Sequence, residues 1–283
     1  MAPVPNTGAG QCGVSRSMRR EMKVLFVGDV IGRPGRMAVG RCVPALRERY
    51  GLDCVIANAE NAAGGIGATP KVLTELLNKG VDLITLGNHT WKHRDLVQGL
   101  DRMHRVVRPA NYAQGVPGRG ATVLTLDSGV RIGVVNLLGR VYLEPCECPF
   151  RAAEREVEAL RRDTPVVFLD FHAEATSEKI AMGWHLNGRC SAVLGTHTHV
   201  QTADECVLPG GTAYITDVGM TGPVDSVLGI ERERVVKRFL TGMPTEFRVA
   251  KGPVALCGVV VTVDEGTGQA QTIERVREMN EAI

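Results

Sequence analysis

The stretch 193-VLGTHTHVQ-201 places two histidines, His197 and His199, at the end of an apolar run. Histidine is scarce in this chain, with 7 among 283 residues. Alternate side chains of an extended segment point to the same side, so both imidazoles are expected to reach one site while Thr198 points away. The stretch therefore indicates a buried strand that ends at a polar site.

Similar short apolar runs, rich in β-branched residues, recur along the chain and alternate with helical patterns. Such runs are typical of strands covered on both faces, and they are 23-KVLFVGD-29, 53-DCVIANAE-60, 81-VDLITLGNH-89, 131-RIGVVNLLG-139, 165-PVVFLDFH-172, 191-SAVLGTHTH-199 and 212-TAYITD-217. Helical patterns occupy 36–49, 70–80, 149–162 and 230–240. Thr69, Pro70 and Gly80 supply the start and stop of the second one. Alternating strands and helices predict an α/β fold.

The two ends of the chain differ from this pattern. Residues 1–21 carry Pro, Gly, Ser and Arg without an apolar core, so we expect a flexible N-terminal extension before a single domain over 22–283. The extension lacks the apolar segment of a secretory signal. At the other end, 255–276 predicts two strands around a glycine-containing turn, which is a hairpin.

Composition excludes several classes of protein. The formal net charge is +2, from 33 Lys and Arg against 31 Asp and Glu, so no global basic footprint supports an RNA partner. No apolar run approaches the ~20 residues of a membrane helix, and we expect no membrane partner. The eight cysteines form no C-x-x-C pair, which favours reduced thiols and a cytoplasmic location.

Five of the apolar runs end in residues that can bind a metal. Sites in open α/β sheets form outside the carboxyl ends of strands, so these side chains are expected to converge. Each alone has an ordinary explanation as a turn, cap or core residue, but their joint placement does not. Imidazoles, carboxylates and an amide in this number exceed one tetrahedral ion and suit a pair of ions. The residues are Asp29, Glu60, Asn61, Asn88, His89, His172, His197 and His199; the structural histidines are expected to be His93, His104 and His185.

These residues lie in motifs that resemble the calcineurin-like metallophosphoesterases and, within them, the bacterial YmdB-like phosphodiesterases. The resemblance extends over nearly everything from Met22 onward. It implies a four-layer α/β/β/α sandwich with a two-metal site. The motifs are 28-GDVIGRPGR-36, 57-ANAENAAGGIG-67, 86-LGNHTW-91, 136-NLLGR-140, 170-DFHAEATSEK-179, 195-GTHTHVQTAD-204 and 216-TDVGMTGP-223.

The resemblance also implies a role for each residue. One ion would be held by Asp29, Glu60 and His199, and the other by Glu60, Asn88, His172 and His197, with Glu60 bridging. Asn61 would be a ligand or hydrogen-bond donor at the same cluster, and His89 would be the catalytic residue that protonates the leaving group. Two departures from the wider superfamily belong to this branch. Ile31 replaces the histidine of the usual D-x-H, and Glu60 with Asn61 replaces the usual bridging Asp.

The implied activity is a metal-dependent phosphodiesterase that acts on 2′,3′- or 3′,5′-cyclic nucleotides by attack of a metal-bridging hydroxide. Iron is the first expectation for the two metal ions, with manganese or zinc as alternatives, and a homo-oligomer is compatible with the sequence. Two other interpretations remain open. One is a phosphomonoesterase or nucleotidase on the same site, and the other is a metal-stabilised, non-enzymatic nucleotide-binding regulator. Arg33 and Arg36 could reach a substrate phosphate, although solvated loop arginines are common.

Overall fold

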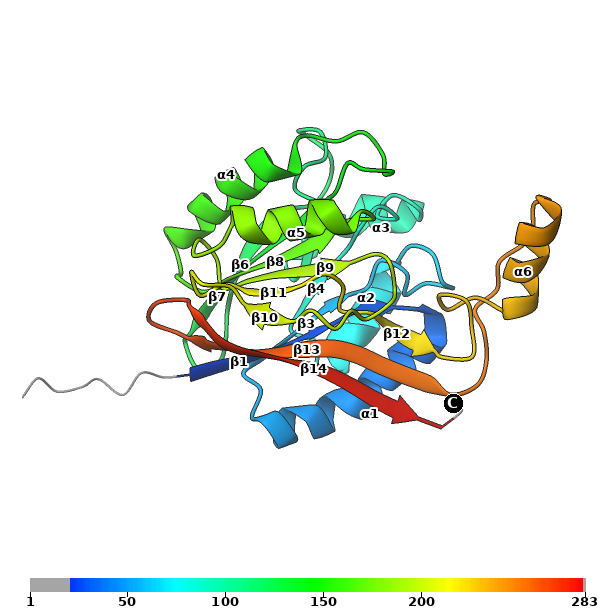
Figure 1. The fold of residues 1–283 in the computed structure, drawn as a ribbon, viewed down its shortest axis with the longest axis horizontal. Coiled ribbons are helices and arrows are strands. Elements are labelled where there is room, and N and C mark those ends of the chain that lie inside the picture. Colours follow the sequence, from blue (N-terminus) through cyan, green and yellow to red (C-terminus); the bar gives the residue numbers. More distant parts are fainter. Residues whose placement is uncertain (1–20, 282–283) are drawn as a thin grey trace, which may run out of the picture.

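Two β-sheets lie face to face between two layers of helices in this computed structural model, which describes residues 21–281 (Figure 1). The extension predicted for residues 1–21 lies outside the described residues, apart from its last residue. Glu21 belongs to the first strand, β1 (Glu21–Val27), where it pairs with Asp264.

The first sheet joins the N-terminal strands to the C-terminal hairpin. Its order is β2-β12-β13-β1-β3-β4-β5, with β14 also paired to β13. Strands β1, β3 and β4 run parallel to their neighbours on the β5 side, whereas β13 runs antiparallel to both β1 and β14. The predicted hairpin is present as the two long strands of that pair. The bounds are β2 (Asp29–Val30), β3 (Cys54–Asn58), β4 (Leu83–Thr85), β5 (Val106–Val107), β12 (Met220–Pro223), β13 (Val254–Asp264) and β14 (Ala270–Asn280).

The second sheet has the order β10-β11-β9-β8-β7-β6. Its four central strands run parallel, and an antiparallel strand closes each edge. Antiparallel edge strands on an otherwise parallel sheet are common in mixed sheets. The bounds are β6 (Ala121–Thr125), β7 (Arg131–Leu138), β8 (Val167–His172), β9 (Ala192–Thr196), β10 (Cys206–Val207) and β11 (Ala213–Ile215).

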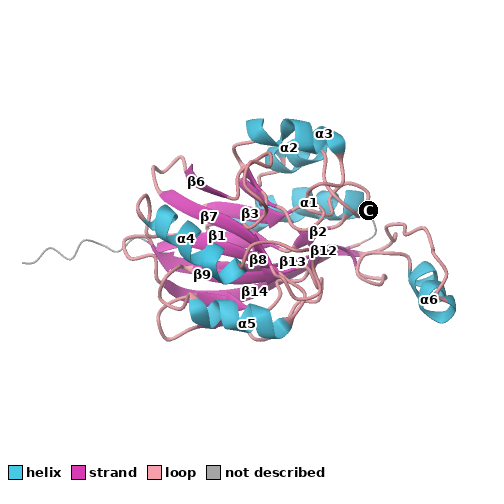
Figure 2. Cartoon of the chain, turned by 90° about the horizontal axis from the view of Figure 1, so that it is seen from above, coloured by secondary structure: helices cyan, strands magenta, loops and turns pink. Residues whose placement is uncertain are grey.

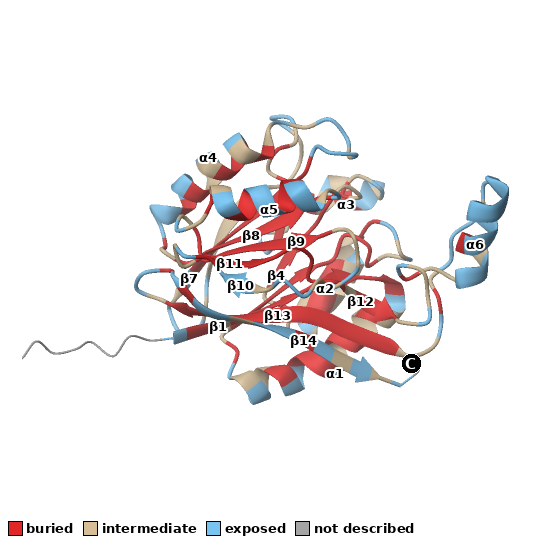
Figure 3. Cartoon of the chain, viewed as in Figure 1, coloured by how far each residue is buried: buried red, intermediate tan, exposed pale blue. Residues whose placement is uncertain are grey.

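Three apolar cores separate the four layers, and the central strands of both sheets are buried along most of their length (Figure 3). Alternate side chains of a central strand belong to different cores. In β1, Leu25 faces the core beneath the first helical layer, while Phe26 faces the core between the sheets. In β8, Phe168 faces that central core, and Leu169 packs under the second helical layer. The predicted α/β/β/α sandwich is therefore confirmed.

The helices agree with the predicted ones in most places. Helices α1, α2 and α3 contribute to the core of the first sheet, and α4 and α5 to that of the second. The Thr69 side chain caps α2, accepting a bond of 3.3 Å from Val72 N. The sequence did not predict α3 or α5, which are 6 and 10 residues long. The bounds are α1 (Gly32–Tyr50), α2 (Pro70–Asn78), α3 (Arg94–Gly99), a 3₁₀ turn η1 (Leu100–Arg102), α4 (Pro149–Arg161), α5 (Thr176–His185) and α6 (Arg232–Thr241).

Helix α6 stands out from the four layers (Figures 1 and 2). Val235 is its one buried residue, whereas Phe239 and Leu240 are more than 80% exposed. Within residues 21–281, no helix has both the length and the apolar character that a membrane crossing requires.

Candidate metal centre

The ends of five strands from both sheets bring the candidate residues to one place. Asp29 follows β1, Glu60 follows β3, and the Asn88–His89 pair follows β4 in the first sheet. His172 is the last residue of β8, and His197 follows β9 in the second sheet. Parallel strands end at a common edge of their sheet. Stacking the two sheets then joins the two edges into a single cluster.

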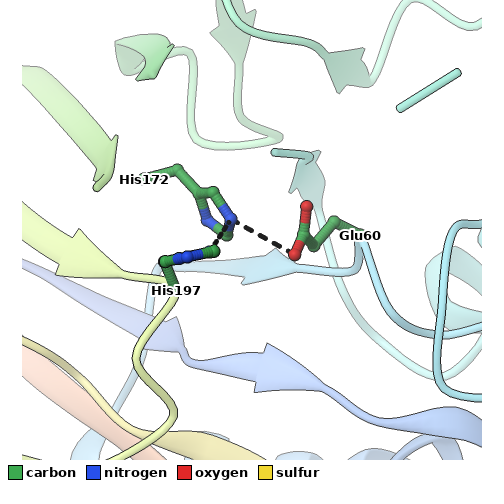
Figure 4. A group of neighbouring side chains, drawn as sticks. All are labelled: Glu60, His172 and His197. Atoms are coloured by element: carbon green, nitrogen blue, oxygen red, sulfur yellow. Dashed lines mark hydrogen bonds and ion pairs between the residues drawn. The ribbon is translucent and has the colours of Figure 1, made fainter. Parts of the chain in front are cut away.

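His172 lies at the centre of one half of this cluster, and it is fully buried. Its Nε2 is 3.0 Å from His197 Nδ1, 3.1 Å from Asn88 Oδ1 and 3.2 Å from Glu60 Oε1. The ligand atoms of Glu60, His172 and His197 all lie within 4.8 Å of one another (Figure 4). These four side chains are the ones that the resemblance assigns to a single ion.

Asp29 and His199 form the other half. Asp29 Oδ1 is 3.8 Å from His199 Nε2, and His199 Nδ1 is 3.2 Å from the carbonyl oxygen of Leu228. The Asp29 carboxylate is fully buried, and its Oδ2 accepts a bond from His197 N at 3.2 Å. Oδ1 has no hydrogen-bond partner among the described residues. A buried carboxylate oxygen without a partner is costly, and a cation would satisfy it.

Glu60, which belongs to the half around His172, also contacts Asn61 and His89. The Asn61 amide donates to Glu60 Oε1 at 2.9 Å, and His89 N donates to Glu60 Oε2 at 3.0 Å. His89 Nδ1 lies 2.8 Å from Asn61 Oδ1. Asn61 thus turns its nitrogen toward the carboxylate and its oxygen toward His89. In this orientation Asn61 is a hydrogen-bond donor to the cluster.

The backbone that carries the two histidines of the H-x-H is not extended. Strand β9 ends at Thr196, and φ is +98° at His197 and +65° at His199. The strand-alternation argument for these two residues is therefore wrong, although both reach the cluster. Residues other than glycine rarely adopt a positive φ, because this backbone conformation costs free energy. Where such residues occur, they concentrate at functional sites.

A buried ion pair helps to hold this turn in place. Lys179 Nζ donates to Asp217 Oδ2 at 2.8 Å, and both side chains are buried. The same carboxylate oxygen accepts from Thr198 N at 3.1 Å and from Thr198 Oγ1 at 2.7 Å. These contacts with Asp217 fix Thr198, the residue between the two histidines.

A second set of polar residues, which the sequence did not reveal, supports the imidazoles from behind. His172 Nδ1 is 2.8 Å from Thr196 Oγ1, which donates to Asp170 Oδ1 at 2.6 Å. Asn58 donates to the other oxygen of Asp170 at 2.9 Å. His197 Nε2 lies 3.1 Å from Glu174 Oε2. Carboxylates behind an imidazole typically fix its tautomer and orientation at metal sites. The D-x-H spacing of Asp170 and His172 was the one sequence signal that could have indicated a carboxylate behind His172.

The charges of the cluster are strongly perturbed. Burial disfavours the charged form of His172, but the Glu60 carboxylate outweighs burial and raises the pKa of His172 to about 9. Burial would raise the pKa of Glu60, yet His172 holds it well below the usual value. Burial, together with repulsion from His172, lowers the pKa of His197 to about 3. Burial raises the pKa of Asp29, an effect that His199 opposes.

The donor set fits bound cations. Two carboxylates, three imidazoles and the Asn88 oxygen are the oxygen and nitrogen ligands that iron, manganese and zinc accept in proteins, and the ligand atoms of three of them already lie together. The unpartnered oxygen of Asp29 would be satisfied by a cation, and the lowered pKa of His197 keeps its imidazole neutral and able to bind a metal.

The remaining histidines lie outside the cluster, as expected. His93 Nε2 contacts the Ile66 carbonyl oxygen, His104 contacts Arg119, and His185 lies 3.4 Å from Glu154.

Arg36 has a structural position. It pairs with Glu75 at 2.9 Å and donates to Ala62 O at 2.7 Å.

Comparison with known proteins agrees with this arrangement. The model of the family described as "YmdB-like protein" matches residues 25–276. The chain is 50% identical over 255 residues to the 2′,3′-cyclic-nucleotide 2′-phosphodiesterase of Bacillus subtilis, covering 90% of this chain and 96% of that protein.

Two crystal structures also match over most of their length. One, of a hypothetical protein from Thermus thermophilus, has a TM-score of 0.85 and 45% identity, covering 92% of this chain and all of that one. The other, of a novel phosphatase from Mycoplasma pneumoniae, has a TM-score of 0.87 and 36% identity, with 94% and 95% covered. On the extent of these matches and the motifs at the cluster, the chain belongs to the YmdB-like family.

Proposed function

We propose that this protein is a metal-dependent phosphodiesterase that hydrolyses nucleoside 2′,3′-cyclic phosphates. The observation that carries the proposal is the meeting of Glu60, His172 and His197 ligand atoms within 4.8 Å, beside Asp29 and His199. The 50% identity to a protein named for this activity supports the choice of substrate.

Two cations are proposed, divided as the resemblance implies. Asn88, His172 and His197 would hold one, Asp29 and His199 the other, and Glu60 would contact both. Iron is the first candidate, with manganese and zinc as alternatives, and imidazole and carboxylate ligands can bind all three. When bound, such a pair supplies Lewis-acid stabilisation of phosphoryl charge and an activated water.

His89 is proposed as the general acid. Its backbone N–H is anchored on Glu60, and its Nδ1 is held by the Asn61 oxygen. The ring is only partly exposed, and it lines the cavity of about 320 Å³ that opens over the cluster. Because Nδ1 donates to Asn61, the ring acts as an acid in its doubly protonated form, in which Nε2 carries the proton for a leaving oxygen. General acid catalysis of this kind contributes about 10²–10⁴-fold in rate.

The bond that breaks defines the product. Water adds at phosphorus, the bond from phosphorus to O2′ breaks, and His89 delivers a proton to O2′. The product is a nucleoside 3′-monophosphate. Two features would serve this step. The bound cations would place positive charge beside the phosphate, and His89 would act as the acid at the edge of the cavity.

The test is hydrolysis of 2′,3′-cyclic AMP by protein loaded with Fe²⁺, Mn²⁺ or Zn²⁺, with the products separated by chromatography. We expect 3′-AMP, and we expect Glu60→Ala to lose both metal and activity. His89→Ala should retain metal and lose about 10²–10⁴-fold in kcat. Full activity in metal-poor Glu60→Ala protein would refute the proposed metal centre.

A phosphomonoesterase is the second candidate, because the Mycoplasma pneumoniae relative is described as a phosphatase. Rates on 2′,3′-cyclic AMP and on 3′-AMP under the same conditions separate the two. Faster release of phosphate from 3′-AMP would favour the second candidate. A cytoplasmic setting is part of the proposal, because all seven cysteines in residues 21–281 are free thiols.

A further inference from the structure

A second cavity adjoins the proposed centre, and the proposed reaction does not use it. This cavity has a volume of about 670 Å³. It shares Gly64 and Phe247 with the cavity of about 320 Å³ that opens over Glu60 and His89. The two cavities therefore meet at Gly64 and Phe247, and a single extended ligand could occupy both.

The cavity over the centre is mainly apolar away from the cluster. Ile66, Leu228, Ile230 and Phe247 line it opposite the histidines. Ile66, Leu228 and Phe247 are each more than 40% exposed. An apolar lining with one aromatic side chain suits a base or sugar face, and it does not suit a free inorganic anion.

The second cavity has a different character, because cations line it and acids do not. Arg33, Arg248 and Lys251 face it, and no carboxylate is among its lining residues. The side chains of Arg33 and Lys251 form no hydrogen bond or ion pair with any residue in 21–281, whereas Arg248 contacts Glu246 at 2.8 Å. Two cations that have no partner within residues 21–281 would attract a phosphate to this cavity, and arginine can bind a phosphate in a bidentate manner.

We propose that the second cavity binds a further phosphate of the substrate, on the 5′ side of the nucleoside whose cyclic phosphate reacts. This rests on the proposed function and narrows its substrate class. The reacting phosphate lies at the metal centre, the nucleoside lies against Phe247, and the 5′-phosphate lies between Arg33 and Lys251. The preferred substrate is then a 5′-phosphorylated nucleoside 2′,3′-cyclic phosphate, which is the chemistry of an oligoribonucleotide end.

A third cavity also adjoins His199 and is lined by arginines, so it is the alternative place for the further phosphate. This cavity of about 450 Å³ on the other side of His199 is lined by Arg275 and Arg277. Arg275 is paired with Glu205 at 2.7 Å. A ligand that extended in that direction would depend on Arg277 instead of Arg33 and Lys251.

The experiment compares kcat/KM for adenosine 2′,3′-cyclic phosphate with that for its 5′-phosphorylated form, using the metal-loaded full chain. We expect the wild type to prefer the 5′-phosphorylated compound by about 25- to 100-fold, mainly through KM, with Arg33 and Lys251 contributing independently. Arg33→Gln and Lys251→Gln should each reduce this ratio about 5- to 10-fold, as expected for one hydrogen bond from an exposed side chain. The double variant should show a ratio near one.

Two variants serve as controls. Lys237→Gln changes an exposed cation on α6 that lines neither cavity, and Arg277→Gln tests the third cavity. Both should keep the wild-type ratio. Equal rates on the two substrates in the wild type would overturn the proposal while leaving the proposed function intact. So would a ratio that responds to Arg277→Gln but not to the double variant. Hydrolysis of neither compound would overturn both.

Discussion

Replacing Thr196 by valine should weaken metal binding without touching any proposed ligand. The hydroxyl connects the His172 ring to the buried Asp170 carboxylate, with contacts of 2.8 and 2.6 Å. Because Thr196 donates to Asp170, its lone pair accepts the Nδ1 proton of His172. With Nδ1 as the protonated nitrogen, metal binding would displace the proton from Nε2 and leave its lone pair for the cation, on the side of Glu60, Asn88 and His197. Valine has the same shape and offers no acceptor, so the ring loses the contact that fixes its tautomer.

The expected loss follows from what such supporting groups contribute. Loss of a hydrogen-bond partner behind a ligating histidine typically costs 10- to 100-fold in metal affinity, or about 1.4–2.8 kcal/mol. Thr196→Val also leaves an oxygen of Asp170 without its donor in a fully buried place. The metal-free protein should therefore lose about 1–3 kcal/mol in its free energy of unfolding. Competition with a chelator measures the first quantity, and urea unfolding measures the second.

Thr212→Val separates the two effects. Thr212 is also fully buried, and its hydroxyl donates to Cys190 O at 2.7 Å. It immediately precedes β11 and contacts none of the candidate ligands. It should lose a similar amount of stability and keep its metal affinity. If Thr196→Val bound metal as tightly as Thr212→Val, the supporting role of the Asp170–Thr196 pair would be refuted.

Four further predictions test the charges and the packing of the site. Metal binding at pH 7.5 should release about one proton from His172, whose pKa in the metal-free protein is raised to about 9; calorimetry in buffers of different ionisation enthalpy measures it, and an enthalpy independent of buffer would contradict it. Because that pKa is raised, the stability that protonated His172 gives the metal-free protein is present below about pH 6.5 and is lost as the pH rises through about 9. Gly87→Ala should lower metal content at least about tenfold, since its Cβ would lie 2.3 Å from Glu60 Oε2 and 2.5 Å from His172 Nε2. Lys179→Met should cost about 3–5 kcal/mol in the free energy of unfolding, because it leaves the buried Asp217 charge without its cation.

The predictions for Gly87→Ala and Lys179→Met each have a matched control. Gly266→Ala adds a methyl group that meets only Asp264 Oδ1 at 3.4 Å, so elemental analysis should show wild-type metal content. Lys237→Met removes an exposed cation and should change the urea midpoint little. A metal-replete Gly87→Ala protein, or an unchanged midpoint in Lys179→Met, would contradict the corresponding contact.

Much of the fold could be predicted from the chain because its strands are buried on both faces. Runs such as 165–172 and 191–199 correspond closely to β8 and β9, and the polar residues after them lie at the cluster because parallel strands end at one edge. Short segments contain too few residues for an apolar periodicity to indicate a helix or a strand. α3 has one buried residue and β5 has two residues in all, so neither could be distinguished from a loop.

The supporting residues were harder to predict than the candidate ligands. Asp170 and Thr196 lie inside strands, where a polar side chain gives no sign of its partner. Their contact spans neighbouring strands of the sheet, with Asp170 paired to Leu194 and His172 to Thr196 in the register of β8 and β9. Glu174 and Lys179 likewise depend on tertiary contacts with His197 and Asp217. Sequence spacing marks where strands end, and the register between strands determines which polar groups meet.

Ile31 shows how a departure from the superfamily pattern is accommodated. It occupies the place of the histidine in D-x-H, and it is buried against two glycines. A Cβ on Gly229 would lie 2.7 Å from Ile31 Cγ2, and a Cβ on Gly222 would lie 2.9 Å from Ile31 Cβ. The residue before Gly229 is Leu228, whose carbonyl oxygen contacts His199 Nδ1 at 3.2 Å. Position 31 thus packs against the loop whose Leu228 carbonyl oxygen contacts His199. We therefore expect Ile31→His to lower metal content, and a metal content equal to that of the wild type would contradict this packing argument.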